Sequence, residues 1–561
     1  MKKIGISLIA LIITVVVLII LAAVIILAIN KNDLFSSSKE AKFKNDVMAF
    51  NDELNVYVMT KYIGHLGEYS RTSLNAQNIQ NIQGDIQPIQ NIIPSMTDKV
   101  YLSKIKVTDG KLAFSNLTEE EQKWINELQP LLNTSSTDGS FSEGDTTNSY
   151  IQAGVNPPIV PSSNNQYSTI VGQGINAITF DANGKVQIVT DLSQEWFQYI
   201  AQTSDTTSGG TSKWANIQTK DGSQWVWIPR FAYKITKGAH TKVGYKDFNG
   251  LTEGEAGTIE IKFLKGNTNQ FYDGNGTAQI DPNNITYNEN GVQSNFLVHP
   301  GFCFDGKQLT GFWAAKYEAS SAQGNGDSLD ADNVLNIKTL QIKPNVSSWR
   351  YMEAKNMFGN CIFLGTEHFD VYGLKQNTNT HLLKNDEWGA IAYLAHSTYG
   401  RNGTEITANQ NEDYITGSGG KLASTTGNYY GVFDLSGGAH DAVAAKFDLN
   451  QSDFDIFGKD TDVSEYIEIY PKYANTYKGD ALFETSLRFS TTTSWFSDLS
   501  WSVNASEPFM SRGGCISDGT SAGIFAFYRY KPEWYQLARV SYRPTITLEQ
   551  IANTGIVGSH T

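Results

Sequence analysis

The chain has 561 residues, enough for about three domains at roughly 150 residues each. Its 43 Lys and Arg against 57 Asp and Glu give a net charge of −14, and it has no block of basic residues, which argues against nucleic acid as a partner. Only 18% of residues are charged, while 12% are aromatic and 49 are glycine. This composition favours a loop-rich folded binding scaffold and excludes a disordered chain. The three cysteines, Cys303, Cys361 and Cys515, are too few for a disulfide framework or a Cys-rich zinc site, although one pair could form.

An uncharged apolar segment runs from Ile4 to Asn30, after Lys2 and Lys3. About 20 apolar residues at 1.5 Å each cross a hydrocarbon layer of about 30 Å. The apolar core of a secretory signal is shorter, about 7–15 residues. Residues 1–33 are therefore predicted to form a leader and a retained transmembrane helix. The two lysines favour a cytoplasmic N-terminus, which would place the rest of the chain outside the cell as the ectodomain of a single-pass membrane protein.

The start of this segment carries a resemblance to a known family. A short basic leader ending in Gly5, then Ile6 and a long β-branched helix, resembles the type IV pilins and pseudopilins of Gram-positive bacteria. The resemblance implies cleavage after Gly5, Ile6 as a methylated new N-terminus, and assembly with other pilin subunits. Pilins usually have Glu five residues after the cut, where this chain has Ala10. A plain uncleaved membrane anchor therefore remains the alternative.

A small α+β stalk domain is predicted over residues 34–132. Apolar residues continue past the membrane segment at helical spacing, among them Phe43, Val47 and Phe50. An Asp-Gly pair at 109–110 between alternating runs predicts a hairpin, and residues 119–132 predict a short amphipathic helix. Residues 133–166 are rich in Ser, Thr, Asn, Gly and Pro, which predicts a flexible linker.

Residues 167–561 are predicted to form one large mixed α+β domain. Sequence blocks occur in a recognisable order: QWVWIPRFAYKI at 224–235, GFWAAKYEAS at 311–320, HLLKNDEWGAIAYLAHS at 381–397, STTGNYYGVFDLSGGAHDAV at 424–443, MSRGGCISDG at 510–519 and ARVSYRPTITL at 538–548. In order and wording they resemble the formylglycine-generating-enzyme-like version of the C-type lectin fold. Arg512 and Arg543 lie beside Gly or Pro in strand-like runs and are interpreted as structural arginines that bond carboxylates or loop carbonyls.

The residues that formylglycine generation requires are incomplete. The active enzymes of that family carry a pair of cysteines after the RGG block, because thiolates bind copper. This chain has Cys515 there and no second cysteine, so we expect no enzyme activity. No catalytic residues are predicted, and the eight histidines show no zinc-binding spacing. Calcium is the one cofactor considered: Asp453, Asp455, Asp460 and Asp462, or Asp327, Asp330 and Asp332, could supply oxygen ligands, although solvated loops explain both groups equally well.

The last hundred residues also resemble the C-terminal variable region of lectin-fold ligand-binding proteins that are diversified by retroelements. The matching words are GDALFETS at 479–486, TSWFSDLSW at 493–501, EPFMSRGG at 507–514, SDGTSAGIFAF at 517–527 and VSYRP at 540–544. The resemblance implies that residues between these words project from one binding face. The candidates are Phe496, Leu499, Trp501, Cys515, Ile516, Tyr528, Arg529, Tyr530, Trp534, Tyr535 and Gln536. Trp534 and Gln536 weaken the retroelement version specifically, because adenine-targeted diversification of Asn codons yields neither residue.

The stretch YRYKPEWYQ at 528–536 supports a binding face on physical grounds. Tyr, Trp and Arg give large, rigid contacts at low entropic cost and dominate binding hot spots. The leading hypothesis is a cell-surface or pilus-associated adhesin or receptor that binds an extracellular protein or glycan, on another cell or a phage, without chemical turnover. The alternatives are a structural pilin or pseudopilin subunit with no ligand, and a divergent enzyme of the formylglycine-generating type.

Overall fold

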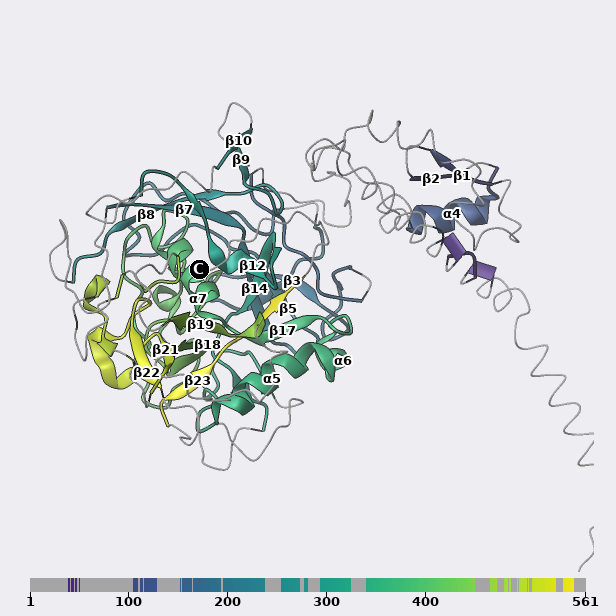
Figure 1. Cartoon of the computed structure of the whole chain (residues 1–561). Coiled ribbons are helices and arrows are strands. Elements are labelled where there is room, and N and C mark those ends of the chain that lie inside the picture. Colours follow the sequence, from purple (N-terminus) through teal and green to yellow (C-terminus); the bar gives the residue numbers. More distant parts are fainter. Residues whose placement is uncertain are drawn as a thin grey trace, which may run out of the picture. The chain divides into compact units, whose positions relative to one another are not determined.

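The computed structural model describes parts of residues 39–50 and 104–128 and most of 152–548, with larger gaps at 238–253, 281–292, 324–339, 449–464, 472–478 and 531–537. The chain divides into two compact units, Met1–Thr146 and Thr147–Thr561 (Figure 1). The predicted membrane segment at 1–33 lies outside the described residues and stays a prediction. Within the described ranges, no helix has the length and apolar character needed to cross a membrane.

In the N-terminal unit, the predicted hairpin and helix are both confirmed. Strand β1 (Ile105–Thr108) pairs antiparallel with β2 (Lys111–Phe114), and Thr108 lies opposite Lys111, as a two-residue turn requires. Helix α4 (Glu119–Leu128) begins with a capping box, because Thr118 and Glu121 exchange backbone-to-side-chain hydrogen bonds of 2.8 and 3.2 Å. These local signals place the elements correctly because they depend only on neighbouring residues.

The core of this unit comes from the predicted apolar stripe. Phe43, Val47 and Phe50 are all buried, and the ring of Phe43 lies 5.5 Å from that of Trp124 on α4. The helical spacing read from the sequence therefore corresponds to a face that packs on α4.

The C-terminal unit contains a seven-stranded antiparallel sheet in its described part. In sheet order its strands are β17 (Asn379–Leu382), β24 (Pro544–Thr547), β14 (Gly311–Ala315), β6 (Gln224–Pro229), β5 (Asn216–Gln218), β3 (Asn176–Phe180) and β4 (Val186–Ile188). The run predicted at 224–235 divides after Pro229, and its second half forms β7 (Phe231–Lys237) of a three-stranded sheet with β8 (Thr258–Phe263) and β11 (Leu297–Val298). Proline has no backbone N–H to donate to a neighbouring strand, which is consistent with the end of β6 at Pro229.

A mixed sheet carries four of the eleven predicted binding residues, Trp501, Tyr528, Arg529 and Tyr530. In order it contains β19 (Glu468–Pro471), β18 (His440–Asp448), β21 (Phe509–Arg512), β22 (Phe527–Tyr530) and β20 (Ser500–Trp501), and β23 (Val540–Tyr542) also pairs with β18. Two-stranded ribbons are formed by β9 (Gln270–Tyr272) with β10 (Thr277–Gln279), β12 (Cys303–Phe304) with β13 (Lys307–Gln308), and β15 (Ser320–Ser321) with β16 (Leu340–Gln341).

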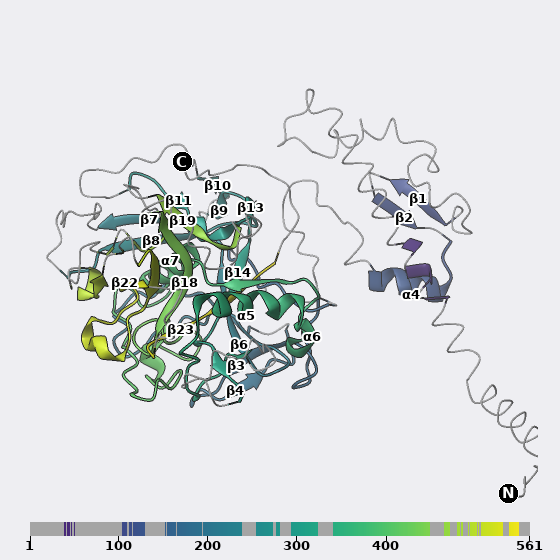
Figure 2. The ribbon, with the colours of Figure 1, turned by 60° about the horizontal axis from the view of Figure 1, so that its bottom comes forward.

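The block at 381–397, which the sequence predicts to be a helix, divides in the structure: His381 and Leu382 belong to strand β17, and the helix begins at Asn385. Helix α7 (Asn385–His396) is buried along its whole length and contacts β8, β18 and the 3₁₀ turn η4 (Pro300–Phe302). Helix α5 (Ala354–Thr366) packs against β17 and is followed by the short α6 (Phe369–Tyr372), and Figure 2 shows both helices along one side of the unit. Because α7 has no exposed face, its middle segment AIAYLA is apolar on every side, while its buried polar residues lie at the two ends.

The predicted linker at 133–166 differs from the structure at its C-terminal end. Val155, Asn156 and Val160 are buried in the C-terminal unit. The Asn156 side chain accepts from Gly266 N at 2.7 Å and donates to the carbonyls of Gly266 and Thr310 at 2.8 Å. A polar, proline-containing composition predicts a linker. Here, however, the polar side chain of Asn156 makes hydrogen bonds to backbone groups of distant loops.

The two arginines interpreted as structural are confirmed in that role. Arg543 is fully buried, donates to Asp441 Oδ2 at 3.0 Å and also bonds the carbonyls of Ala315 and Phe433. Arg512 is equally buried and donates to the Ala481 carbonyl at 2.8 Å. Both side chains connect segments that are far apart in the sequence.

Candidate functional site

Three of the predicted binding residues meet on the edge strand β20 of the mixed sheet and on its neighbour β22. Strands β20 and β22 pair in parallel, and Trp501 lies opposite Tyr528. Their rings are 4.9 Å apart in an edge-to-face arrangement, and the guanidinium carbon of Arg529 lies 4.8 Å from the centre of the Trp501 ring. All three side chains are half-buried. They form a cluster of two rings and one cation that remains partly accessible to solvent, hereafter the Trp501 cluster.

The cation of this cluster is held in place by an acid. Arg529 Nε lies 2.6 Å from Glu507 Oε2, and the two side chains are 17% and 23% exposed. A partly buried ion pair with a ring against one face restricts the guanidinium to one orientation. The arrangement therefore presents a fixed cation beside an aromatic surface. A surface of this kind is suited to non-covalent contact with a ligand.

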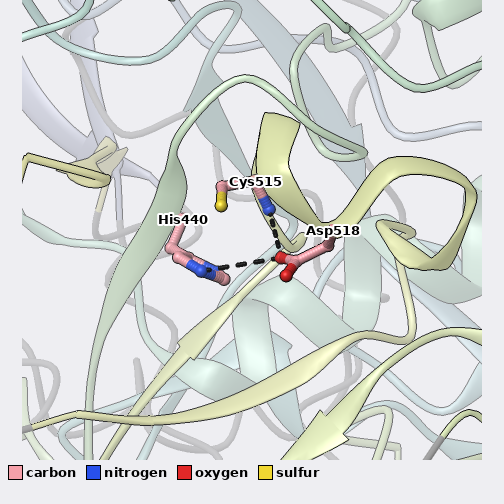
Figure 3. Close-up of side chains that lie close together, drawn as sticks. All are labelled: His440, Cys515 and Asp518. Atoms are coloured by element: carbon pink, nitrogen blue, oxygen red, sulfur yellow. Dashed lines mark hydrogen bonds and ion pairs between the residues drawn. The ribbon is translucent and has the colours of Figure 1, made fainter.

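Next to this cluster, a histidine, a cysteine and an aspartate converge (Figure 3). The Tyr528 ring lies 4.7 Å from the ring of His440, the first residue of β18. Cys515 precedes the 3₁₀ segment η10 (Ile516–Ser521), and Asp518 within that segment accepts the Cys515 backbone N–H at 2.7 Å. One ligating atom from each of His440, Cys515 and Asp518 lies within 4.8 Å of the others.

Two consecutive glycines bring Cys515 into this position. Gly513 and Gly514 have φ of +86° and +68°, a backbone conformation that other residues adopt at a cost. A β-carbon on Gly514 would also lie 2.7 Å from the Ala522 α-carbon. The RGG block thus turns the chain tightly from β21 into η10 and directs the cysteine inward. Cys515 is 0% exposed, so the prediction that it projects from the surface is wrong.

Burial determines the charge of the groups in this cluster. It lowers the pKa of His440 to about 4, although Asp518 acts in the opposite direction, so the imidazole is neutral at pH 7. Burial likewise raises the pKa of the Cys515 thiol, so the thiol is protonated in the chain alone. Neither group acts as a charged partner of the other at neutral pH.

Other predicted residues lie apart from the Trp501 cluster or remain undescribed. Phe496 packs against His396 and Phe525, with ring distances of 5.5 and 6.2 Å, and borders a cavity of about 10 Å³, room for about one water molecule. Leu499 is half-buried, and its backbone N–H donates to the Ser521 carbonyl at 2.7 Å. Ile516 is half-buried at the start of η10, next to Cys515.

Some predicted residues fall outside the described part of the chain. They are Gly5, Ile6, Trp534, Tyr535, Gln536, the side chain of Tyr530 and the acidic groups proposed for calcium at 327–332 and 453–462. Three described residues at the site were not predicted: His440, Glu507 and Asp518. Each lies within or beside a recognised sequence block, but only the pairing of β18, β21 and β22 brings it to the Trp501 cluster.

Comparisons with known proteins return distant structural likenesses only. No protein-family model matches the chain, and no curated protein sequence matches it. The chain is similar to PvdO from Pseudomonas aeruginosa (12% identity, 60% of this chain and all of that one, TM-score 0.28). It is also similar to Treponema denticola variable protein 1 (9% identity, 58% and 96%, TM-score 0.23) and to a Major Tropism Determinant, M1 variant (14% identity, 72% and 85%, TM-score 0.25). Because these TM-scores are low, the function of this chain is inferred from its own geometry.

Proposed function

We propose that this chain is a surface-exposed, non-catalytic ligand-binding protein whose C-terminal unit, with a C-type-lectin-like fold, binds an extracellular protein or glycan. The single observation that carries the proposal is the Trp501 cluster, in which Arg529 is held by Glu507 against an accessible ring. Preorganised aromatic and arginine side chains lose little entropy on binding and are typical hot spots. The ectodomain placement is supported by the apolar segment at 4–30 alone.

The absence of turnover is part of the same proposal. The three cysteines lie on separate elements, Cys303 on β12, Cys361 on α5 and Cys515 before η10, and none forms a disulfide. Copper-dependent formylglycine chemistry needs two neighbouring thiolates. The positions of these cysteines therefore support a binding protein over an enzyme of that type.

Binding is tested with the purified, fluorescently labelled full-length chain on a glycan array and on a panel of intact bacterial cells. For any probe that binds, Trp501→Ala and Arg529→Ala are expected to weaken the affinity at least about 30-fold, since hot-spot truncations cost about 2 kcal/mol or more. The matched control is Val171→Ala, which truncates a side chain that is 70% exposed elsewhere on the unit. Unchanged affinity in both cluster variants would refute the site assignment.

We also propose that this face varies between isolates, as the resemblance to diversified variable regions implies, and this proposal has its own test. Coding sequences for residues 493–543 are compared among many closely related isolates. Substitutions are expected at Trp501, Tyr528 and Arg529, while the buried Arg512 and Arg543 stay constant because they connect distant segments. A uniform sequence across the region would instead indicate a fixed receptor or a structural pilin.

A further inference from the structure

His440, Cys515 and Asp518 form a group that ligand binding by the Trp501 cluster does not require. His440 Nε2 lies 3.7 Å from Asp518 Oδ2, too far for a hydrogen bond (Figure 3). With zinc bonds of 2.0–2.3 Å, two ligands of one tetrahedral ion are separated by about 3.3–3.6 Å. The observed spacing therefore suits two ligands of one ion better than a hydrogen-bonded pair, and the thiol lies within the same 4.8 Å group.

The histidine and the aspartate of this group are held in place, and one histidine nitrogen has no other role. Asp518 Oδ2 is oriented by the Cys515 backbone N–H, and the His440 ring packs against Tyr528. His440 is 4% exposed, and its Nε2 is the ring nitrogen that faces Asp518 Oδ2, at a distance beyond hydrogen bonding. Its Nδ1 has no hydrogen-bond partner among the described residues. Nε2 is therefore available as the nitrogen ligand of an ion placed between the histidine and the aspartate.

We propose that His440, Cys515 and Asp518 bind a divalent transition-metal ion of borderline softness, with zinc as the best match. One nitrogen, one sulfur and one oxygen ligand suit zinc, whereas calcium requires six to eight oxygens. A thiolate and a carboxylate offset the +2 charge, and the thiol proton passes to solvent on binding. Three protein ligands leave one position of a tetrahedral ion for water or a ligand group.

The position of the site gives the ion access and relates it to the proposed binding face. The Asp518 side chain is 13% exposed and the neighbouring Ser517 is exposed, so an ion can enter from solvent. Tyr528 contacts both His440 and Trp501. The metal site is thus adjacent to the Trp501 cluster and goes beyond the ligand-binding role proposed for that cluster.

The test uses the metal alone. The purified full-length chain is stripped of metal with a chelator and titrated with Zn²⁺ against a chromophoric competitor. A parallel titration uses Co²⁺, whose thiolate charge-transfer absorption reports a metal–sulfur bond directly. We expect one zinc per chain. Cys515→Ser and His440→Gln should each weaken zinc affinity at least about 10-fold, because removing even a residue that only supports a metal ligand costs about that much. Cys303→Ser, a half-buried thiol elsewhere, is the matched control and should change neither reading.

Two results would overturn the metal site: no stoichiometric zinc binding by the wild-type chain, or cobalt–thiolate absorption that persists in Cys515→Ser. If circular dichroism shows that Cys515→Ser does not fold, the zinc affinity of His440→Gln decides the question. Since no ligand is present in these titrations, their failure would leave the proposed binding function standing. Failure of the array experiment would likewise leave the metal site standing.

Discussion

Replacing Glu484 with glutamine should change the pH dependence of stability. Glu484 is 1% exposed, its Oε1 accepts a hydrogen bond of 2.6 Å from the Tyr393 hydroxyl, and its Oε2 has no hydrogen-bond partner among the residues that the structure describes. Burial raises the pKa of this carboxyl from 4.5 to about 7 in the folded chain, although the bond from Tyr393 acts to lower it. The folded state therefore holds a proton that the unfolded state has already released between pH 4.5 and 7.

The sign and the size of the effect follow from this difference in pKa. Because the folded-state pKa is raised, the stabilising contribution is fully present below pH 4.5 and is lost as the pH rises through 7. A pKa difference of about 2.5 corresponds to about 3 kcal/mol. Glutamine keeps an oxygen that can accept the Tyr393 hydrogen bond and never ionises. Glu484→Gln should therefore match the wild type near pH 4.5 and exceed its stability at pH 8 by up to about 3 kcal/mol.

The assay is urea unfolding of the full-length chain, followed by tryptophan fluorescence at several pH values from 4.5 to 8. The quantity compared is the difference in the free energy of unfolding between Glu484→Gln and the wild type. Glu260→Gln, on the exposed side of β8, is the matched control and should leave that difference constant. If the difference for Glu484→Gln is as flat with pH as that for Glu260→Gln, the reasoning about this buried carboxyl is wrong.

Three further substitutions test other features by thermal or urea unfolding. Arg543→Met should destabilise the C-terminal unit by about 3–5 kcal/mol, because it leaves the buried Asp441 without its cation, whereas a loss under 1 kcal/mol would contradict this. Asn156→Ala should cost about 2–4 kcal/mol by leaving the buried amide and carbonyl of Gly266 unsatisfied and by removing one of the two hydrogen bonds to the Thr310 carbonyl, and no loss would mean that this stretch is a linker after all. Gly514→Ala should cost about 1–3 kcal/mol, because of its positive φ and the approach to Ala522, and wild-type stability would argue against the tight turn.

Local elements were predictable from the sequence because their signals are local. The hairpin of β1 and β2 follows from an Asp-Gly pair between alternating strands, and α4 follows from the capping residue Thr118. Helix α7 was predicted from the block at 381–397, although His381 and Leu382 belong to strand β17. The end of the predicted linker was wrong for the converse reason: the side chain of Asn156 bonds backbone groups more than a hundred residues away.

The candidate site likewise combines residues that the sequence indicated with contacts that only the fold establishes. Residue type indicated an exposed binding stretch at 528–536, which includes Tyr528 and Arg529, because its hydroxyls and guanidinium are costly to bury. Trp501 became a candidate only through the resemblance to lectin-fold variable regions. No spacing in the sequence connects His440 with Cys515 and Asp518, and the sequence pattern favoured an exposed cysteine. The pairing of β18 with β21, and the glycine turn after β21, bring the three groups together.

From its sequence alone, this chain has an apolar segment that predicts a membrane anchor, a small N-terminal α+β unit, a large mixed C-terminal unit and aromatic candidates for a binding surface. Only the tertiary structure decides which of these candidates meet, that Cys515 faces inward, and that Glu507 holds Arg529 against Trp501. The physical reason is that strand and helix signals depend on residues a few positions apart. Contacts between side chains of separate strands depend on sheet register and on turns, which no local pattern specifies.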